Sequence, residues 1–300
     1  MSPSNPLGEY LRARREQVDP ATVGLRVTGV RRTPGLRREE VATLAGISAD
    51  YYLRLEQGRD RHPSPQVLEA LARVYGLDAA ATQYLLGLAA ASPVRARPSQ
   101  RKAVPAGIRQ LLEVVGLPAF VEDRMFDVLA ANDLATALSP ALRPGENRLR
   151  SVFLDPAERE LYPDWEQATA GLIASFRASI GTGAAEDPRI AQLVGELSLA
   201  SEHFRRLWAR HDVRGLGGGT ARMLHPRAGM LELSREKLPV GGSDGQLLVI
   251  YHAAPGSASE RALQRLREER EEVEGDGEAA QASIRSRTST TSPSSRPSAS

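Results

Sequence analysis

Residues 31 to 54 bring together side chains that suit contact with a nucleic acid. Arginine can pair bidentately with the O6 and N7 atoms of guanine, so Arg38 and Arg54 are the candidates for base contacts. Asp50 could accept a hydrogen bond from cytosine N4. Ala49 would share the exposed face of Asp50 and Arg54. The candidates for phosphate contacts, which set register without reading sequence, are Arg31, Arg32, Arg37, Ser48 and Tyr51.

Two short helices would hold these side chains in place. Val41 and Leu44 follow each other at a spacing of three residues, which predicts one helix with an apolar face. Gly46 stands where a helix ends in a residue free to adopt positive φ. Ser48 can then cap a second helix, in which Tyr52 would face the core and the candidate base-contacting residues would face outward.

The stretch from Leu36 to Asp60 closely resembles the Cro/cI-like (XRE) helix-turn-helix repressors. The resemblance implies that the second helix lies in the major groove with its N-terminal residues at the base edges. An ordinary helical hairpin is the alternative. Three further helices are expected around the pair, one over Leu7 to Glu16 with Arg12, Arg14 and Arg15 facing outward, one starting at Ser64 and one capped by Asp78. Five helices ending near residue 90 favour the repressor-like bundle over the hairpin.

Composition limits the kinds of protein that this chain can be. With 300 residues, 41% hydrophobic and 25% charged, it has the makeup of a globular protein of about two domains. The chain has no cysteine, which excludes disulfides, thiolate catalysis and cysteine-based zinc sites. No apolar run approaches the roughly 18 residues of a membrane-spanning helix, and the N-terminus lacks a secretory apolar region. We therefore expect a cytoplasmic, nucleoid-associated protein without a membrane partner.

The predicted organisation is a two-domain, mainly α chain. Residues 1–90 would form the five-helix DNA-binding bundle, and residues 91–105 a basic, proline-containing linker. Residues 106–268 would form an α+β domain. Residues 269–300, charged and then rich in Ser and Thr, would form a disordered tail.

The α+β domain is expected to begin and end with strands. A helix through residues 108–115 precedes a hairpin over residues 119–129, and Asn132 would start the next helix. A sheet assembled from distant segments follows from this order. The later elements are expected as helices over 151–161, 165–180, 187–199 and 201–210, and as antiparallel strands over 222–225, 230–238 and 246–253.

Four phrases of the second domain resemble a known family. They are DVLAAND (127–133), FLDPAERELYPDW (153–165), FRRLWARHDVR (204–214) and VIYHAAPGS (249–257). They look like the MmyB-like ligand-binding domain, often found behind an XRE helix-turn-helix. The resemblance implies a PAS-like fold and a bound fatty acid. Where that family commonly has an aromatic residue before the asparagine, this chain has Ala131.

No motif in the second domain requires an enzyme. The histidines lack zinc-binding spacing, and neither HExxH nor GxSxG occurs. Gly217-Gly218-Gly219 lacks the following Lys-Ser/Thr of a phosphate loop and is read as a loop before a strand. We therefore expect no catalytic residue, no metal and no cofactor.

A ligand pocket between helices and sheet is the favoured hypothesis for the second domain. Apolar walls with a few polar groups are typical of ligand sites. The alternative for each aromatic candidate is simple core packing, and the alternative for His211 and Arg214 is a salt bridge at a surface or interface. The candidate ligand-binding residues are Phe126, Asn132, Phe153, Trp165, Phe176, Trp208, His211 and Arg214.

Together these features predict a sequence-specific DNA-binding transcriptional regulator. Its second domain would bind a small apolar ligand such as a fatty acid, mediate dimerisation, or both. A single bundle offers few base contacts, so a homodimer on an inverted repeat of double-stranded DNA is expected. Two alternatives remain: a ligand sensor whose DNA binding is incidental, and a ligand-free partner-binding or dimerisation module with DNA binding as a tether.

Overall fold

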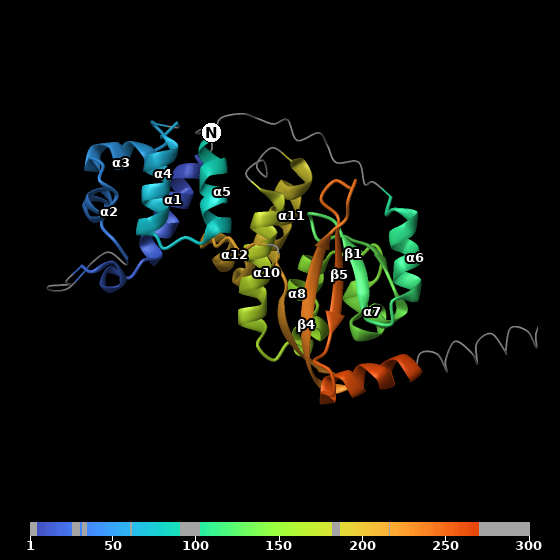
Figure 1. Cartoon of the computed structure of the whole chain (residues 1–300). Helices are drawn as coiled ribbons and strands as arrows, with labels where there is room; N and C mark the ends of the chain where they lie inside the picture. The colour runs from blue at the N-terminus through green and yellow to red at the C-terminus, as the bar shows by residue number, and fades with distance from the viewer. Residues whose placement is uncertain are drawn as a thin grey trace, which may run out of the picture.

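The chain folds into two domains in the computed structural model, an N-terminal helical bundle and a C-terminal α+β domain (Figure 1). The structure describes residues 5–25, 31, 35–60, 62–90, 103–181, 187–215 and 217–269. Most of the expected linker, the expected tail beyond residue 269, and Arg32 lie outside these residues.

The N-terminal domain contains the five helices expected from the sequence, with a short 3-10 helix after the first. They pack around one apolar core that includes Leu11, Leu36, Tyr52, Leu71 and Leu85. The bundle consists of α1 (Pro6–Gln17), η1 (Pro20–Val23), α2 (Arg38–Ala45), α3 (Ala49–Glu56), α4 (Pro65–Val74) and α5 (Ala79–Ala89).

Local sequence signals set the ends of these helices. Gly46 ends α2 at φ 68°, the left-handed region that glycine adopts without strain. The side chains of Ser48, Ser64 and Asp78 each accept a hydrogen bond from a backbone N–H in the first turn of α3, α4 and α5. The predicted turn and caps are therefore confirmed.

Two predictions for single residues of the bundle are wrong. Leu44, expected in the apolar stripe of α2, is 38% exposed, because Val41 and Ala42 form the buried face of that short helix. Arg15, expected to face outward, is only 4% exposed. A charge buried this deeply needs partners, and Arg15 has them in α3 and in the backbone before α2.

The C-terminal domain alternates short helices with a sheet whose strands come from both ends of the segment. Its helices are α6 (Ala106–Val114), α7 (Asp133–Leu138), η2 (Pro140–Leu142), α8 (Arg148–Leu154), α9 (Pro156–Leu161), α10 (Trp165–Ile180), α11 (Pro188–Ala200) and α12 (Glu202–Ala209). The strands are β1 (Ala119–Glu122), β2 (Val128–Ala131), β3 (Gly219–His225), β4 (Gly229–Pro239) and β5 (Leu247–His252). A last helix covers residues 258–269.

The structure has two helices where the sequence predicted one. The prediction placed a single helix over residues 151–161, but α8 ends at Leu154 and α9 begins at Pro156. Proline has no N–H to donate into a preceding turn, so it interrupts the helix. Asp155 caps the new one by accepting from the N–H of Ala157.

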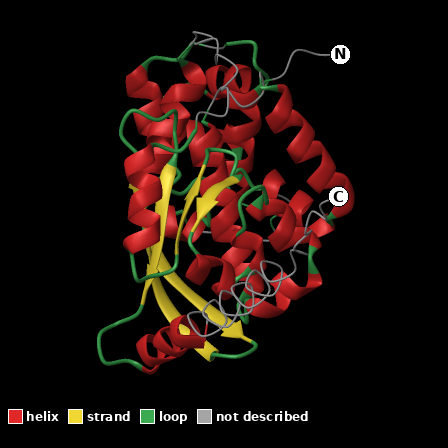
Figure 2. Ribbon diagram, turned by 90° about the vertical axis from the view of Figure 1, so that its right-hand side faces the viewer, coloured by secondary structure: helices red, strands yellow, loops and turns green. Residues whose placement is uncertain are grey.

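The five strands form one antiparallel sheet in the order β2-β1-β5-β4-β3. Strand β1 of the β1-β2 hairpin pairs with β5, the last strand of the sheet in chain order. The sheet is therefore assembled from distant segments, as expected. Helices lie on both sides of the strands (Figure 2). α6 packs on one face against Val121 and Leu248, and the residues 258–269 helix belongs to the core on the other face. None of the helices in the described part of the chain is long and apolar enough to cross a membrane.

Candidate DNA interface and ligand pocket

α3 presents an exposed face on the side of the bundle away from the C-terminal domain (Figure 1). Ala49, Asp50 and Arg54 are exposed on it. Arg54 forms an ion pair with Asp50 one turn earlier, and its guanidinium lies 5.8 Å from the centre of the Tyr51 ring. Surface pairs of this kind are weak, so both side chains can exchange partners at low cost.

The C-terminal end of α3 is fixed by a buried carboxylate. Glu56 accepts hydrogen bonds from Arg15 Nε at 2.6 Å, from Arg38 Nε at 2.6 Å and from the Tyr52 hydroxyl at 2.9 Å. Burial raises the pKa of the Glu56 carboxyl, but the bonds from the two arginines outweigh it and the pKa is lowered. Glu56 therefore holds α1, α2 and α3 together as an ionised group.

The remaining DNA candidates lie around α2. Arg38 is a candidate for a base contact. Its Nε donates a hydrogen bond to Glu56, and its side chain remains 43% exposed. Arg31 forms an ion pair with Glu40 at 2.6 Å and also donates to the carbonyl of Gly35. Arg37 is exposed at the N-cap of α2, and Ser48 caps α3. The structure thus gathers these residues at the N-terminal ends of α2 and α3, where a phosphate is favoured.

A cavity lies between α10 and the β3-β4 edge of the sheet. Its volume is about 530 Å³. Apolar and aromatic walls come from Val152, Leu172, Tyr162 and Tyr251. The charged residues of its lining are four arginines and one carboxylate, which are Arg148, Arg214, Arg222, Arg235 and Asp164.

Two of the four cavity arginines have carboxylate partners. Arg222 pairs with Asp164 at 2.8 Å at the rim. Arg148 pairs with Glu122 at 2.5 Å, and the other oxygen of Glu122 binds Lys237 at 2.9 Å. All three members of this second cluster are buried, and together they carry one net positive charge. The wall of the cavity is therefore positive even after its internal ion pairs are counted.

Arg214 and Arg235 form no ion pair within the part of the chain that the structure describes. The Nε atom of Arg235 is buried without a hydrogen-bond partner. The positive charge of both arginine side chains is therefore not balanced by a paired carboxylate at this wall. The cavity is suited to an anion with an apolar part.

Comparison with known protein families follows the same division of the chain. Residues 6–85 match the model of a helix-turn-helix domain. Residues 104–266, more than half of the chain, match the model of the MmyB-like transcription regulator ligand binding domain. The chain belongs to the MmyB-like transcription regulators. Both models describe regulatory modules, one that binds DNA and one that binds a ligand. No curated protein matches the chain.

In this MmyB-like regulator the predicted aromatic residues form a core and do not line the cavity. Phe126, Phe153 and Phe176 are buried in one cluster, against which Trp165 and Trp208 pack. Their rings contact one another at edge-to-face or stacked distances, for example Phe126 and Phe176 at 5.6 Å. The alternative reading of these aromatics as core residues is the one that the structure supports.

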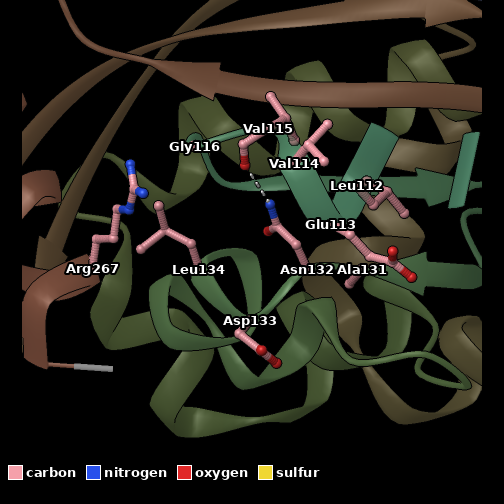
Figure 3. A pocket seen from close by; sticks show the side chains of 10 residues that line it. All are labelled: Leu112, Glu113, Val114, Val115, Gly116, Ala131, Asn132, Asp133, Leu134 and Arg267. Carbon is pink, nitrogen blue, oxygen red and sulfur yellow. Dashed lines mark hydrogen bonds between the residues drawn. The ribbon is translucent and has the colours of Figure 1, made fainter. Parts of the chain in front are cut away.

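Asn132 is also separate from the cavity. Its side-chain oxygen accepts from the N–H groups of Ala119 and Ala135, and its nitrogen donates to the carbonyls of Val115 and Leu117. It lies in a second, more open pocket of about 300 Å³ beside α6, where its amide points toward the Val115 carbonyl (Figure 3). Both polar atoms of the Asn132 side chain form hydrogen bonds with backbone groups, and these bonds fix the start of α7.

His211 and Arg214 lie three residues apart in the sequence but have different surroundings. His211 adopts a positive φ of 54° and places its ring 6.4 Å from that of Tyr10 in α1, at the junction of the two domains. Burial, together with Arg177 and Arg14, lowers the pKa of His211 to about 4, so the ring is neutral near pH 7. Only Arg214, of the residues predicted for ligand binding, lines the large cavity.

Sequence reasoning missed the cavity arginines, although one signal was present. Arg235 and Lys237 continue the alternation of Leu231 and Leu233 along β4, which places all four on one face of the sheet. Two cations on the buried face of a strand require either partners or a ligand. The sequence gives no comparable signal for Glu56, because the residues next to it in the sequence do not show that Arg15, 41 residues away, is its partner.

Proposed function

We propose that this regulator reads DNA with α3 and changes its DNA binding when an anionic, partly apolar molecule occupies the cavity between α10 and β3-β4. The observation that carries the proposal is the cavity itself, whose wall has two arginines without carboxylate partners. A filled domain would instead have favoured the ligand-free partner module. The protein would act in the cytoplasm, on the nucleoid, as a homodimer bound to an inverted repeat.

In the DNA complex, Arg54 would leave Asp50 and donate to a guanine, and Asp50 would be free to accept from a cytosine. The exposure of both side chains supports this assignment. Arg31, Arg32, Arg37, Ser48 and Tyr51 would bind phosphates. Arg38 is the least free of the proposed contacts, because breaking its bond to Glu56 would disturb the bundle.

The DNA assignment predicts different losses for two arginine variants. A duplex is first selected from a random pool by the full chain. Arg54→Ala should lose about 1–3 kcal/mol of discrimination between that duplex and a scrambled one. Arg37→Ala, which removes only a proposed phosphate contact, should weaken both duplexes alike and reduce the salt slope by about one. Equal losses on both duplexes for Arg54→Ala would overturn the assignment.

The proposed ligand is a carboxylic acid with an apolar chain. Its carboxylate would bind Arg214 and Arg235, and its chain would lie against Leu172, Val152 and the two tyrosines. Arginine suits a carboxylate because its planar fork donates two parallel hydrogen bonds. A fatty acid meets this description, and so does any amphipathic acid of similar size.

Titration calorimetry with sodium decanoate tests the ligand class. The wild-type chain should bind decanoate more tightly than 1-decanol, which has the same apolar chain without the charge. Arg214→Gln should weaken decanoate binding about tenfold, as expected for a lost charge-assisted hydrogen bond. Arg12→Gln removes the same charge from an exposed position of α1 and serves as the control. Equal binding of decanoate and decanol would contradict an anion site.

A further inference from the structure

We propose that residues 210–215, here called the docking segment, couple occupancy of the cavity to the position of the DNA-binding bundle. The proposal rests on the proposed function, since it requires a ligand in that cavity. The segment joins α12 to the approach to β3. Its first residues contact α1, and its last residues line the cavity and contact α5.

The first half of the docking segment holds α1. Asp212 accepts from Arg14 Nη1 at 2.6 Å, and the carbonyl of Arg210 accepts from Gln17 Nε2 at 2.6 Å. The ion pair is largely shielded, with side chains 20% and 23% exposed. Between these two bonds the His211 ring lies against Tyr10. The contact between the docking segment and α1 therefore consists of two polar interactions with an aromatic contact between them.

The second half packs on the bundle and reaches the cavity within two residues. Val213 packs against the apolar core of the N-terminal domain. Gly215 lies so close to α5 that a Cβ on it would meet the Cβ of Ala80 at 3.5 Å. Arg214, between them, lines the cavity, and its N–H donates to the carbonyl of Ala174 in α10 at 3.1 Å. Arg214 and Gly215 therefore line the cavity, while Val213 and Gly215 contact the bundle.

α1 can pass a change in docking to α3. Arg14 faces the docking segment, and the next residue, Arg15, donates to Glu56 at the end of α3. Arg15 also donates to the carbonyl of Leu36, just before α2. Because Arg15 and Glu56 are almost fully buried, α1 cannot shift without moving the helices that would contact DNA.

The direction of the coupling follows from the geometry. In this structure Arg214 lines the cavity at the same time as Asp212 holds Arg14, so the two interactions are compatible. In the proposal, an undocked segment can move Arg214 away from the cavity, so an anion that binds Arg214 there favours the docked bundle. By thermodynamic reciprocity, the docked bundle must favour anion binding to the same degree.

Charge reversal on α1 tests this reciprocity without touching the cavity. Arg14→Glu places a carboxylate opposite Asp212 and should undock the bundle. Decanoate binding to the full chain, measured by calorimetry, should then weaken by about fivefold or more, the usual lower range of coupling between sites. Arg12→Glu makes the same charge change on the same helix at an exposed residue and should bind decanoate as the wild type does. Circular dichroism establishes that both variants are folded.

The outcomes separate the coupling from the ligand site. Equal decanoate affinity in Arg14→Glu and the wild type would overturn the coupling and leave the cavity site standing. Failure of the wild type to bind decanoate would overturn both. Equal losses in Arg14→Glu and Arg12→Glu would show a general charge effect and would also overturn the coupling.

The distance between a label on the bundle and a label on the C-terminal domain is a second measure of docking. The chain has no cysteine, so two labels can be attached through Glu69→Cys in α4 and Leu199→Cys in α11, which are both exposed positions. Arg14→Glu should broaden the distance distribution between the two labels, and saturating decanoate should restore the wild-type distribution. A distribution that Arg14→Glu leaves unchanged, or that decanoate cannot restore, would contradict the proposal.

Discussion

At the scale of single residues, Glu56 is the group on which the DNA-binding bundle most depends. It is fully buried and ionised, and its partners come from the first three helices. Removing one member of a buried ion pair is costly because the other charge stays behind without a partner. In this bundle the charge left behind would be Arg15, which is itself buried.

Glu56→Gln should therefore destabilise the protein by about 3 kcal/mol, as for other broken buried pairs. The effect depends on pH. Since the pKa of Glu56 is lowered on folding, its ionisation contributes stability above the unfolded value of 4.5, and that contribution is lost as the pH falls through the folded value. The difference between variant and wild type should shrink below pH 4.5.

Urea unfolding at pH 7 and at lower pH measures this difference. Glu69→Gln, a carboxylate exposed on α4, is the matched control and should leave the unfolding midpoint near that of the wild type. A Glu56→Gln variant as stable as this control at pH 7 would show that the buried network contributes little to the bundle.

Single residues were predicted well where a local rule decides their role and poorly where a distant partner does. Gly46 and Ser48 follow from the turn and cap that their own helices need. Arg15 and Glu56 lie 41 residues apart, so no local pattern pairs them. The aromatic residues had core packing as the stated alternative to a pocket, but the sequence pattern could not decide between the two, because the cavity is formed by other segments.

At the scale of elements, periodicity predicted most helices and strands, because each has a buried face of its own. The exception is the split between α8 and α9, where Asp155-Pro156 was passed over although proline and a capping residue mark a new helix. The cavity could not be derived from any one element. Its wall combines α8, α10, β3, β4 and β5, and it exists only because the sheet brings β3 and β4 beside α10.

The docking segment is the element whose importance the sequence least revealed. Its residues belong largely to the phrase at 204–214 that resembles the MmyB-like family. The sequence predicts a ligand-binding role for His211 and Arg214. In the structure Arg210, Asp212 and Val213 contact the bundle. His211 has a positive φ, which is uncommon outside glycine, and both of its neighbours, Arg210 and Asp212, contact α1.

At the scale of the whole molecule, the two domains have separate apolar clusters and meet through polar and aromatic contacts and the packing of Val213. α1 and α5 face the C-terminal domain, and α2 and α3 lie on the other side of the bundle (Figure 1). Interfaces between domains of one chain generally permit relative motion unless they are large and apolar. This arrangement leaves the proposed recognition helix accessible while the bundle remains docked.

The central claim, that a ligand in the C-terminal domain controls DNA binding by the N-terminal one, is tested most directly by one comparison. The affinity of the full chain for its selected duplex is measured at fixed salt, with and without saturating decanoate. We predict a change of about fivefold or more, within the usual range for coupled sites. The same affinity in both conditions, for a chain that calorimetry shows to be loaded with decanoate, would contradict the account.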